Sequence, residues 1–300
     1  MANLTLKQLR YFEAVANSGH FGRAADACSI SQPAISVQIK ELEQTLGAAL
    51  FERSPRQIKL TSFGDEFASR ARDILRAVDD LGDLGRASLE GLVGKLRLGI
   101  IPTIAPYLLP RIIGNLTLSH GDLDLHIRET MTAKLITELV EGRLDTAIVA
   151  LPVSEPSLFE APLFDENFVL VRPIADGDKP VPSAASLSNM RLLLLEEGHC
   201  FRDQALSFCG MRTPLPREGM DGSSLSTLVQ MVGTGIGVTL IPEMAVGIET
   251  KSADVAISHF TTPQPSRTIG MVWRKTSPLT KQFTQIADVV KQSADELLGR

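Results

Sequence analysis

The stretch RAADACSISQPAISVQIKELEQTLGAALFERSPRQIKLTSFG, residues 23–64, contains two helical patterns, a very short turn between them and a basic segment after them. The turn at residues 29–30 is too short to hold any other element. Ser31 is a favourable N-cap for the second helix, and Pro33 falls in its first turn, where proline is tolerated. Gly47 is typical of the end of such a helix. Two helices joined by a tight turn, the second with a polar leading face, predict a helix-turn-helix.

The exposed positions of the second helix carry amides, hydroxyls and one small apolar side chain. Amides and hydroxyls can hydrogen-bond base edges or phosphates, and alanine can approach a thymine methyl group. The segment LFERSPRQIKLT alternates like a short hairpin and would place basic side chains on the phosphate backbone, as a wing does. The alternative is a small helical domain with an ordinary polar surface. The turn length, the Ser-Gln-Pro entry and the basic hairpin together favour DNA binding, through Ser31, Gln32, Pro33, Ala34, Ser36, Gln38, Lys40, Arg53, Arg56 and Lys59.

Charge is unevenly distributed along the chain, which has a net charge of -5 over 300 residues. Taken alone, that total argues against a nucleic acid as partner. Residues 1–60, however, contain seven Lys or Arg and five Asp or Glu, which leaves +2 there and -7 on the remainder. A basic head on an acidic body again favours DNA binding by the head.

Helices are also predicted on both sides of the opening stretch. Upstream, Thr5 and Gln8 form a capping-box pattern. Downstream, one long helical pattern runs from Thr61 to about Leu92. An exposed helix of that length needs a partner, so we predict that it dimerises; the alternative is packing against its own chain. A seam with heptad spacing supports dimerisation, although two glycines weaken it: Phe67, Ile74, Leu81 and Ser88, with Ala71 and Val78 between them.

The composition is that of an ordinary soluble globular protein, with 44% apolar and 22% charged residues. The length suggests about two domains. No run of about 18 apolar residues predicts a membrane span, and the N-terminus lacks a signal-peptide pattern, so we expect a cytoplasmic protein without a membrane partner. The 3 cysteines do not make a secreted disulfide scaffold, and they never cluster with the 5 histidines at ligand spacing. We therefore expect no metal and no cofactor.

The remainder of the chain alternates strand and helix. KLRLGII, LDLHIR and LDTAIVA are apolar strand patterns separated by helical ones, which implies an α/β sheet with parallel strands. The pattern restarts at FVLVRPI and indicates a second α/β lobe. The predicted fold class is therefore α/β, with an all-α-type winged helix-turn-helix head. Thr103 and Thr132 follow two strands of the first lobe. Each is most often a helix cap, but ligands of such sheets bind at strand ends, so both are pocket candidates.

Two of the cysteines lie in EEGHCFRDQALSFC, residues 196–209. A strand ends before this stretch and FRDQALSFC has a helical pattern, so Cys200 would lie at a helix N-terminus. There the backbone N–H groups and the helix dipole favour a thiolate. Arg202, and His199 if protonated, would act in the same direction, whereas the two glutamates upstream would oppose it. The alternative for Cys200 is a loop residue of no consequence.

The spacing of these cysteines has a mechanical consequence. Cys209 lies nine positions after Cys200, which on an intact helix is a rise of about 13.5 Å with the side chains on opposite faces. A disulfide needs Cα atoms within about 7 Å. Joining the two thiols therefore requires the helix between them to unwind, so oxidation would change the shape of the protein. The alternative is that Cys209, like Cys28, is a small core residue.

The segment at residues 23–64 strongly resembles the winged helix-turn-helix of LysR-type transcriptional regulators, and a looser resemblance continues along the whole chain. Within that family, IPTIAPYLLP, EEGHCFRDQALSFC and SRTIGMVWR resemble the OxyR branch, whose members respond to hydrogen peroxide. The run GHC-x-RDQA-x-x-FC is the discriminating element. The resemblance implies a DNA-binding domain at 1–62, a dimerisation helix at 63–92 and a regulatory domain at 93–300. That domain would be similar to periplasmic binding proteins, with a cleft between two lobes. The first lobe would span about 93–165 plus 268–300, and the second 166–267.

The resemblance also implies functional residues and partners. Cys200 would be the peroxidatic thiol, oxidised to a sulfenic acid, and Cys209 the resolving thiol of a Cys200–Cys209 disulfide. Five residues would match the positions that hold peroxide or polarise the thiol: Thr103, Thr132, His199, Gln204 and Arg267. Thr130 is an alternative to Thr132 at one of these positions. The implied partners are inverted-repeat DNA, RNA polymerase, further copies of the chain in a dimer and a tetramer, and glutaredoxin or thioredoxin as reductant. The protein would control antioxidant genes and would not be an enzyme.

Three other functions fit parts of the sequence. A LysR-type regulator could respond to a small metabolite in the cleft, with cysteines that are incidental. A thiol peroxidase would need rapid turnover of the disulfide and would have no use for the head. A secreted solute-binding protein would need a signal peptide.

Overall fold

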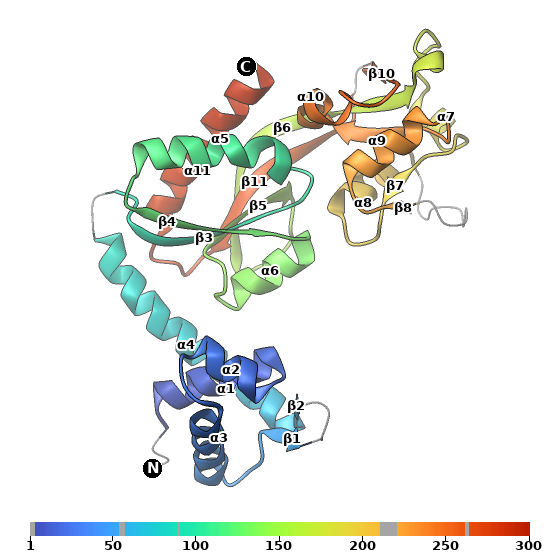
Figure 1. Ribbon diagram of the computed structural model, residues 1–300. Coiled ribbons are helices and arrows are strands. Elements are labelled where there is room, and N and C mark those ends of the chain that lie inside the picture. Colours follow the sequence, from blue (N-terminus) through green and yellow to red (C-terminus); the bar gives the residue numbers. More distant parts are fainter. Residues whose placement is uncertain (1–3, 54–57, 89–90, 211–220, 262–263) are drawn as a thin grey trace. The chain divides into compact units, whose positions relative to one another are not determined.

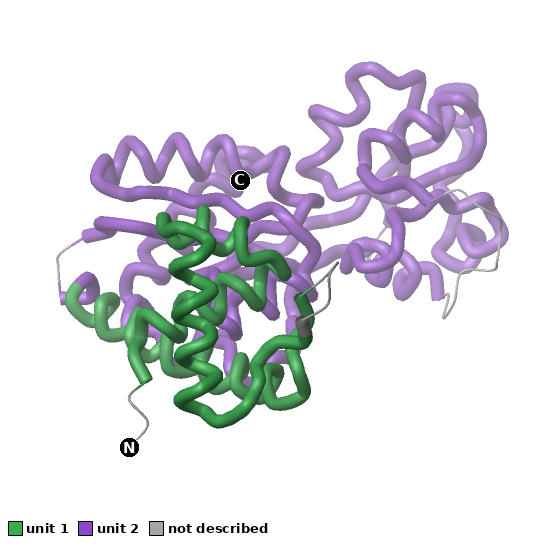
Figure 2. The backbone as a smooth tube through the Cα atoms, turned by 60° about the horizontal axis from the view of Figure 1, so that its bottom comes forward, with its two compact units in different colours: residues 1–85 green, residues 86–300 purple. Residues whose placement is uncertain are grey.

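The computed structural model describes residues 4–53, 58–88, 91–210, 221–261 and 264–300. The chain forms two compact units, Met1–Gly85 and Arg86–Arg300 (Figure 2). Each unit has its own hydrophobic core. Within the described ranges, no helix is both long enough and apolar enough to cross a membrane.

The first unit is a helix-turn-helix followed by a hairpin (Figure 1). The capping box is present, because Gln8 N donates to Thr5 Oγ1 over 3.2 Å and Thr5 N donates to Gln8 Oε1. Ser31 accepts from Ala34 N, and Gly47 ends its helix at a φ of +69°. These predictions are confirmed. The elements are α1 (Leu6–Ser18), α2 (Phe21–Ala27), α3 (Gln32–Leu46), the antiparallel pair β1 (Phe51–Arg53) and β2 (Ile58–Leu60), and α4 (Ser62–Ala87).

The core of this unit is centred on Phe12, whose side chain is fully buried. Its ring lies 5.3 Å from the ring of Phe51 on the hairpin and 5.0 Å from that of Phe67 on α4. One aromatic side chain of α1 therefore holds both the wing and the long helix against the helix-turn-helix. These contacts place the exposed leading face of α3 and the hairpin on a common scaffold.

The long helix α4 differs from its prediction in two ways. It ends at Ala87, earlier than the predicted Leu92, because Leu92 is buried in the core of the second unit. The heptad seam is also divided. Ala71 is buried in the core of the first unit, whereas the side chains of Ile74 and Leu81 are 47% and 67% exposed. The exposed half of the seam is accessible to a partner helix, and dimerisation through α4 stays a prediction.

The second unit begins with a lobe of alternating strands and helices. Strand β3 pairs in parallel with β4 and with β5, as the sequence predicts. The chain then leaves this lobe on the long strand β6 and returns on β11, which lies between β5 and β6 and is antiparallel to both. The elements are β3 (Gly94–Ile100), α5 (Ala105–Ser119), β4 (Leu123–Glu129), α6 (Thr132–Val140), β5 (Thr146–Leu151), β6 (Leu158–Pro173), β11 (Ser266–Arg274) and α11 (Thr280–Leu298).

The second lobe of this unit is also α/β, but its pairing is mostly antiparallel. Strands β9 and β10 both run antiparallel to β6, and among the described residues parallel pairing in this lobe is confined to β7 with β8 and one isolated bridge. The antiparallel pairs arise on the continuation of β6, the strand that carries the chain between lobes. The elements are α7 (Ala184–Leu187), β7 (Leu194–Leu195), α8 (Cys200–Phe208), β8 (Asp221–Gly222), α9 (Leu225–Gly233), β9 (Thr239–Pro242), α10 (Val246–Glu249) and β10 (Val255–Ser258).

Candidate functional site

The two thiols of EEGHCFRDQALSFC lie at opposite ends of one helix. Cys200 is the first residue of α8, His199 is its N-cap, and Cys209 is its C-cap, whose N–H donates to Ala205 O over 3.1 Å. Both thiols are free. Cys200 is partly exposed, whereas only 4% of Cys209 is exposed. The predicted helix between the thiols is therefore present, and it separates an accessible thiol from a buried one.

Burial raises the pKa of Cys209 to about 11, from an ordinary value of 9.0. In the unfolded chain this thiol loses its proton near pH 9, but in the folded protein it keeps the proton until about pH 11. The stability that this difference contributes is complete below pH 9 and is lost as the pH rises through 11. At neutral pH Cys209 is consequently a protonated thiol and a poor nucleophile for as long as α8 stays folded.

This linkage predicts an alkaline instability specific to Cys209. Between about pH 8 and pH 10.5, we expect the free energy of unfolding to fall by about 2 kcal/mol more in the wild type than in Cys209→Ala. Urea denaturation in reducing buffer would measure it, followed by the fluorescence of the single tryptophan, Trp273, which is buried in the second unit. Parallel loss of stability in the two proteins would contradict the assignment.

The structure gives the state of the two side chains that were expected to favour a Cys200 thiolate. His199 is 7% exposed, and burial lowers its pKa, although Glu196, 4.0 Å away, acts in the opposite direction. The imidazole is therefore neutral at neutral pH and acts as a hydrogen-bonding group, not as a cation. Arg202 is engaged elsewhere: it donates to Leu195 O over 2.6 Å and lies 3.0 Å from a carboxylate oxygen of Asp221.

A second cation, Arg267, is buried where β6 and β11 pair. Its Nη1 donates to Thr103 Oγ1 over 2.8 Å and its Nη2 to Thr103 O over 3.0 Å. Its Nε donates to Glu166 Oε2 over 2.9 Å, and both side chains of this ion pair have no exposed surface. The guanidinium also lies over the ring of Phe201, 5.5 Å from its centroid. Arg267 thus joins a strand end of the first lobe to the residue that follows Cys200.

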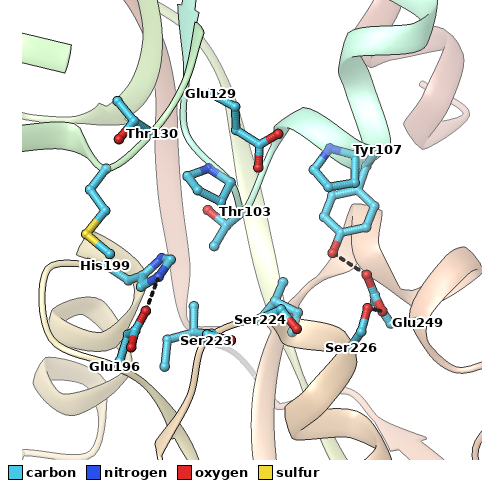
Figure 3. Close-up of a pocket in the computed structure, with 15 residues that line it drawn as sticks. Thr103, Tyr107, Glu129, Thr130, Glu196, His199, Ser223, Ser224, Ser226 and Glu249 are labelled. Atoms are coloured by element: carbon cyan, nitrogen blue, oxygen red, sulfur yellow. Dashed lines mark hydrogen bonds and ion pairs between the residues drawn. The ribbon is translucent and has the colours of Figure 1, made fainter. Parts of the chain in front are cut away.

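A cavity of about 350 Å³ opens between the two lobes of the second unit (Figure 3). Thr103 and Thr130 line it from the first lobe, and His199 from the second. At its other end, Tyr107 on α5 donates to Glu249 Oε1 over 2.6 Å and so joins the two lobes. Burial and this carboxylate raise the pKa of Tyr107, which keeps the phenol protonated.

The structure brings only some of the predicted site residues to this cavity. Thr103 and His199 line the cavity, and Arg267 donates a hydrogen bond to Thr103 Oγ1 without lining the cavity itself. Thr132 does not line it, and the prediction that Thr132 caps its helix is wrong. The N-cap is Met131, and Thr132 lies inside the first turn with a buried Oγ1 that has no hydrogen-bond partner among the described residues. Gln204 lines a separate groove beside Phe208, and its buried Oε1 likewise has no partner in the part of the chain that the structure describes.

Three further residues of this region escaped the sequence analysis: Glu166, Tyr107 and Glu249. Glu166 and Glu249 have no local motif, and Tyr107 lies in the quoted stretch IPTIAPYLLP without any sign of its role; each owes its place to a partner 78 to 142 positions away in the chain. Within the described ranges, no group of three or more His, Cys, Asp or Glu residues could hold a metal ion.

The helix-turn-helix presents most of the predicted DNA-facing side chains. Ser36 and Gln38 are half-buried, and Gln38 donates to Glu41 over 2.8 Å. Val37, which the sequence analysis did not single out, is 52% exposed on the same helix. Arg56 and the side chain of Arg53 lie outside what the structure describes. The remaining predicted side chains that the structure describes are exposed: Ser31, Gln32, Pro33, Ala34, Lys40 and Lys59.

Comparison with known proteins agrees with this two-part organisation. Residues 6–65 match the family described as bacterial regulatory helix-turn-helix protein, lysR family, and residues 89–295 match the LysR substrate binding domain. The DNA-binding transcriptional dual regulator OxyR of Escherichia coli K12 is 39% identical over 296 residues, which cover 97% of this chain and 96% of that protein. A probable hydrogen peroxide-inducible genes activator of Streptomyces viridosporus is 40% identical over 303 residues, 98% and 95% of the two chains.

Solved structures give the same result. A full-length OxyR variant from Pseudomonas aeruginosa has a TM-score of 0.78 at 36% identity and covers 96% of this chain and 95% of its own. A peroxide-bound OxyR mutant from Corynebacterium glutamicum has a TM-score of 0.69 at 35% identity, with coverage of 98% and 94%. This chain and its OxyR relatives share both domains in the same order, and the sequence identity extends over nearly the full length of the chain. The chain belongs to the LysR family of DNA-binding transcriptional regulators and, within that family, to the OxyR branch.

Proposed function

We propose that this protein is a transcriptional regulator that senses hydrogen peroxide through Cys200 and Cys209. The observation that carries the proposal is the placement of two free thiols at the two ends of α8, one accessible and one buried. The printed names of the relatives, which include hydrogen peroxide-inducible genes activators, support the same function. Such a regulator acts on DNA in the cytoplasm.

The oxidation of the two cysteines proceeds in two steps, formation of a sulfenic acid and formation of a disulfide. The thiolate sulfur of Cys200 attacks one oxygen of hydrogen peroxide, the O–O bond breaks, and the other oxygen leaves as water after taking up a proton. The product is a sulfenic acid on Cys200. The thiol of Cys209 then displaces the hydroxyl group of the sulfenic acid as a second water, and a Cys200–Cys209 disulfide forms. Thr103, Thr132, His199, Gln204 and Arg267 are the proposed peroxide-holding or thiol-polarising residues; Thr103 and His199 line the adjoining cavity.

The second step requires a change of shape. With α8 intact, the Cα atoms of the two cysteines are separated by about 13.5 Å of helix rise, and a disulfide permits about 7 Å. Unwinding α8 also exposes Cys209 to solvent and so removes the burial that keeps it protonated. The covalent bond then stabilises a conformation that the reduced protein does not favour, which is how a local redox event biases a two-state element.

The DNA-binding half of the proposal rests on the first unit. The exposed face of α3 would enter the major groove, with basic residues of the hairpin on phosphates. The exposed apolar residues Ile74 and Leu81 of α4 would pair two chains, so that two heads bind the halves of an inverted repeat. We propose a dimer of dimers that contacts RNA polymerase at antioxidant genes, with glutaredoxin or thioredoxin as reductant.

Thiol counting after addition of one equivalent of peroxide tests the redox pair. We expect the wild type to lose two thiols and to gain no oxygen by intact mass, because the oxygen leaves as water. Cys200→Ser should lose none, and Cys209→Ser should gain one oxygen on Cys200. Continuous consumption of peroxide with a thiol reductant at catalytic rates would instead support a peroxidase. Retention of all three thiols in the wild type would reject the proposed pair.

The inter-lobe cavity favours a second candidate, a regulator that binds a small metabolite. Its volume of about 350 Å³ lies within the range of small-molecule sites. In that case the cysteines would be incidental, and their replacement would leave the response intact. The Cys200→Ser variant therefore separates the two functions.

A further inference from the structure

We infer that Glu166 is a positioning residue for peroxide reduction: it fixes the guanidinium of Arg267 so that the hydroxyl of Thr103 presents its proton to the inter-lobe cavity. The inference rests on the proposed function. It adds to that function a residue that contacts neither the thiol nor the cavity.

The ion pair between Glu166 and Arg267 has a fixed geometry. The two residues are register partners on the antiparallel strands β6 and β11, so their side chains leave the sheet on the same side. Nε and Nη2 of Arg267 lie 2.9 and 2.8 Å from the same carboxylate oxygen, Oε2. Both side chains are fully buried, where each charge needs the other.

The second carboxylate oxygen prevents rotation of the pair. Glu166 Oε1 accepts from the backbone N–H of Met244, over 3.0 Å, just after β9 in the second lobe. Each oxygen therefore has its own donor, and the carboxylate cannot turn without losing a buried hydrogen bond. The plane of the Arg267 guanidinium is fixed as a result, and its remaining N–H groups point toward Thr103.

This arrangement determines the direction of the Thr103 O–H bond. Arginine only donates hydrogen bonds, so Thr103 Oγ1 must accept from Nη1. The hydroxyl proton is then directed elsewhere, and no acceptor among the described residues binds it. Thr103 is 3% exposed and lines the cavity that His199 also lines. A hydroxyl that accepts from a cation is a stronger donor, because hydrogen bonds in a chain polarise one another.

The network also reaches the helix that carries the thiol. Phe201 follows Cys200 and stacks against the guanidinium, and His199 precedes Cys200 and lines the cavity. Of the two neighbours of the thiol, Phe201 therefore contacts the Arg267 guanidinium and His199 lines the same cavity as Thr103. When the thiolate attacks and the O–O bond breaks, the leaving oxygen gains negative charge before it becomes water. A fixed O–H donor from Thr103 stabilises that charge.

The test compares two reactions of Cys200 in two full-length proteins. One carries Cys209→Ser alone, and the other carries Cys209→Ser together with Glu166→Gln. Oxidation by hydrogen peroxide needs a donor for the leaving oxygen; alkylation by iodoacetamide needs only an accessible thiolate. Both rates are measured at the same pH, on the plateau of the alkylation rate, and the modification of Cys200 is followed by peptide mass spectrometry. We expect the peroxide rate to fall about 10- to 100-fold in Glu166→Gln, with the alkylation rate changed less than about twofold.

Three further variants complete the experiment. Thr103→Val keeps the ion pair and removes only the hydroxyl, so it should show the same selective loss, and Thr103→Ser should restore the peroxide rate. Glu138→Gln is the matched control, since Glu138 is also a buried carboxylate paired with an arginine, but on α6. It should leave both rates unchanged.

Several results would overturn the inference. An unchanged peroxide rate in Glu166→Gln or in Thr103→Val would do so, and so would an equal fall of both rates, which indicates a purely structural role. If Glu166→Gln does not fold, an unchanged peroxide rate in Thr103→Val still overturns the inference, because the inference requires the Thr103 hydroxyl. Failure of the wild-type Cys200 to react with peroxide would instead reject the proposed function, which keeps the two failures distinct.

Discussion

Replacing Cys200 with serine is expected to abolish the response to peroxide while leaving the fold and DNA binding of the reduced protein intact. A serine hydroxyl does not ionise near neutral pH and is a poor nucleophile toward the O–O bond. Serine is also well tolerated at a helix N-terminus, so α8 should remain folded. We expect oxidation of the 200–209 pair to fall below detection, a loss of more than about 100-fold. Thiol counting and transcript levels after peroxide treatment of cells would measure it.

Cys28→Ser is the matched control for that experiment. Cys28 is the third free thiol, partly buried at the end of α2 in the first unit. It receives the same chemical change outside the redox pair and should keep the full response. If peroxide still induces transcription in Cys200→Ser, the regulator responds to something other than this thiol, and a metabolite in the cavity becomes the better account.

Replacing Phe12 with alanine is expected to unfold the DNA-binding unit. The side chain is fully buried and contacts the rings of Phe51 and Phe67, so its removal leaves a cavity where α1, the hairpin and α4 meet. Such truncations cost about 3–5 kcal/mol. A unit of this size has a total stability of about 4–13 kcal/mol, so the loss is a large part of it. Specific DNA binding should disappear, and amide exchange in α1 and α3 should become fast.

Phe63→Ala provides the comparison, because Phe63 is the same residue type on α4 but is 40% exposed. It should cost less than about 1 kcal/mol and leave DNA binding unchanged. The fluorescence of Trp273 should be unaffected by either change, since that residue lies in the other unit. Equal effects of the two variants would show that the Phe12 cluster does not hold the head together.

Local features of this protein could be predicted from the sequence because neighbouring residues determine them. The capping box at Thr5, the end of α3 at Gly47 and the thiols at the two ends of α8 each depend on residues within one or two helical turns. The error at Thr132 has a local cause too. The chain RETMT offers several residues at which a helix can begin, and the helix starts with Met131 as its cap.

Features that depend on distant partners could not be predicted. Arg267 was identified by resemblance, but its partner Glu166 lies 101 positions earlier and has no motif of its own. Only the register of β6 with β11 brings them together. The neutral state of His199 has the same origin, because burial by distant segments outweighs the nearby Glu196. The Glu166–Arg267 pair and the burial of His199 therefore exist only once the sheet has assembled.

The position of β11 has a consequence for how the protein is made. It is the last strand of the chain, yet it occupies an inner place in the sheet between β5 and β6. On the ribosome the head is complete early and can fold first, as N-terminal domains do. Cys200 and Cys209 emerge well before Arg267, so the nascent chain carries both thiols before the cation that packs against Phe201. The sheet of the second unit can therefore be completed only after β11 has been synthesised, when the DNA-binding head is already able to fold.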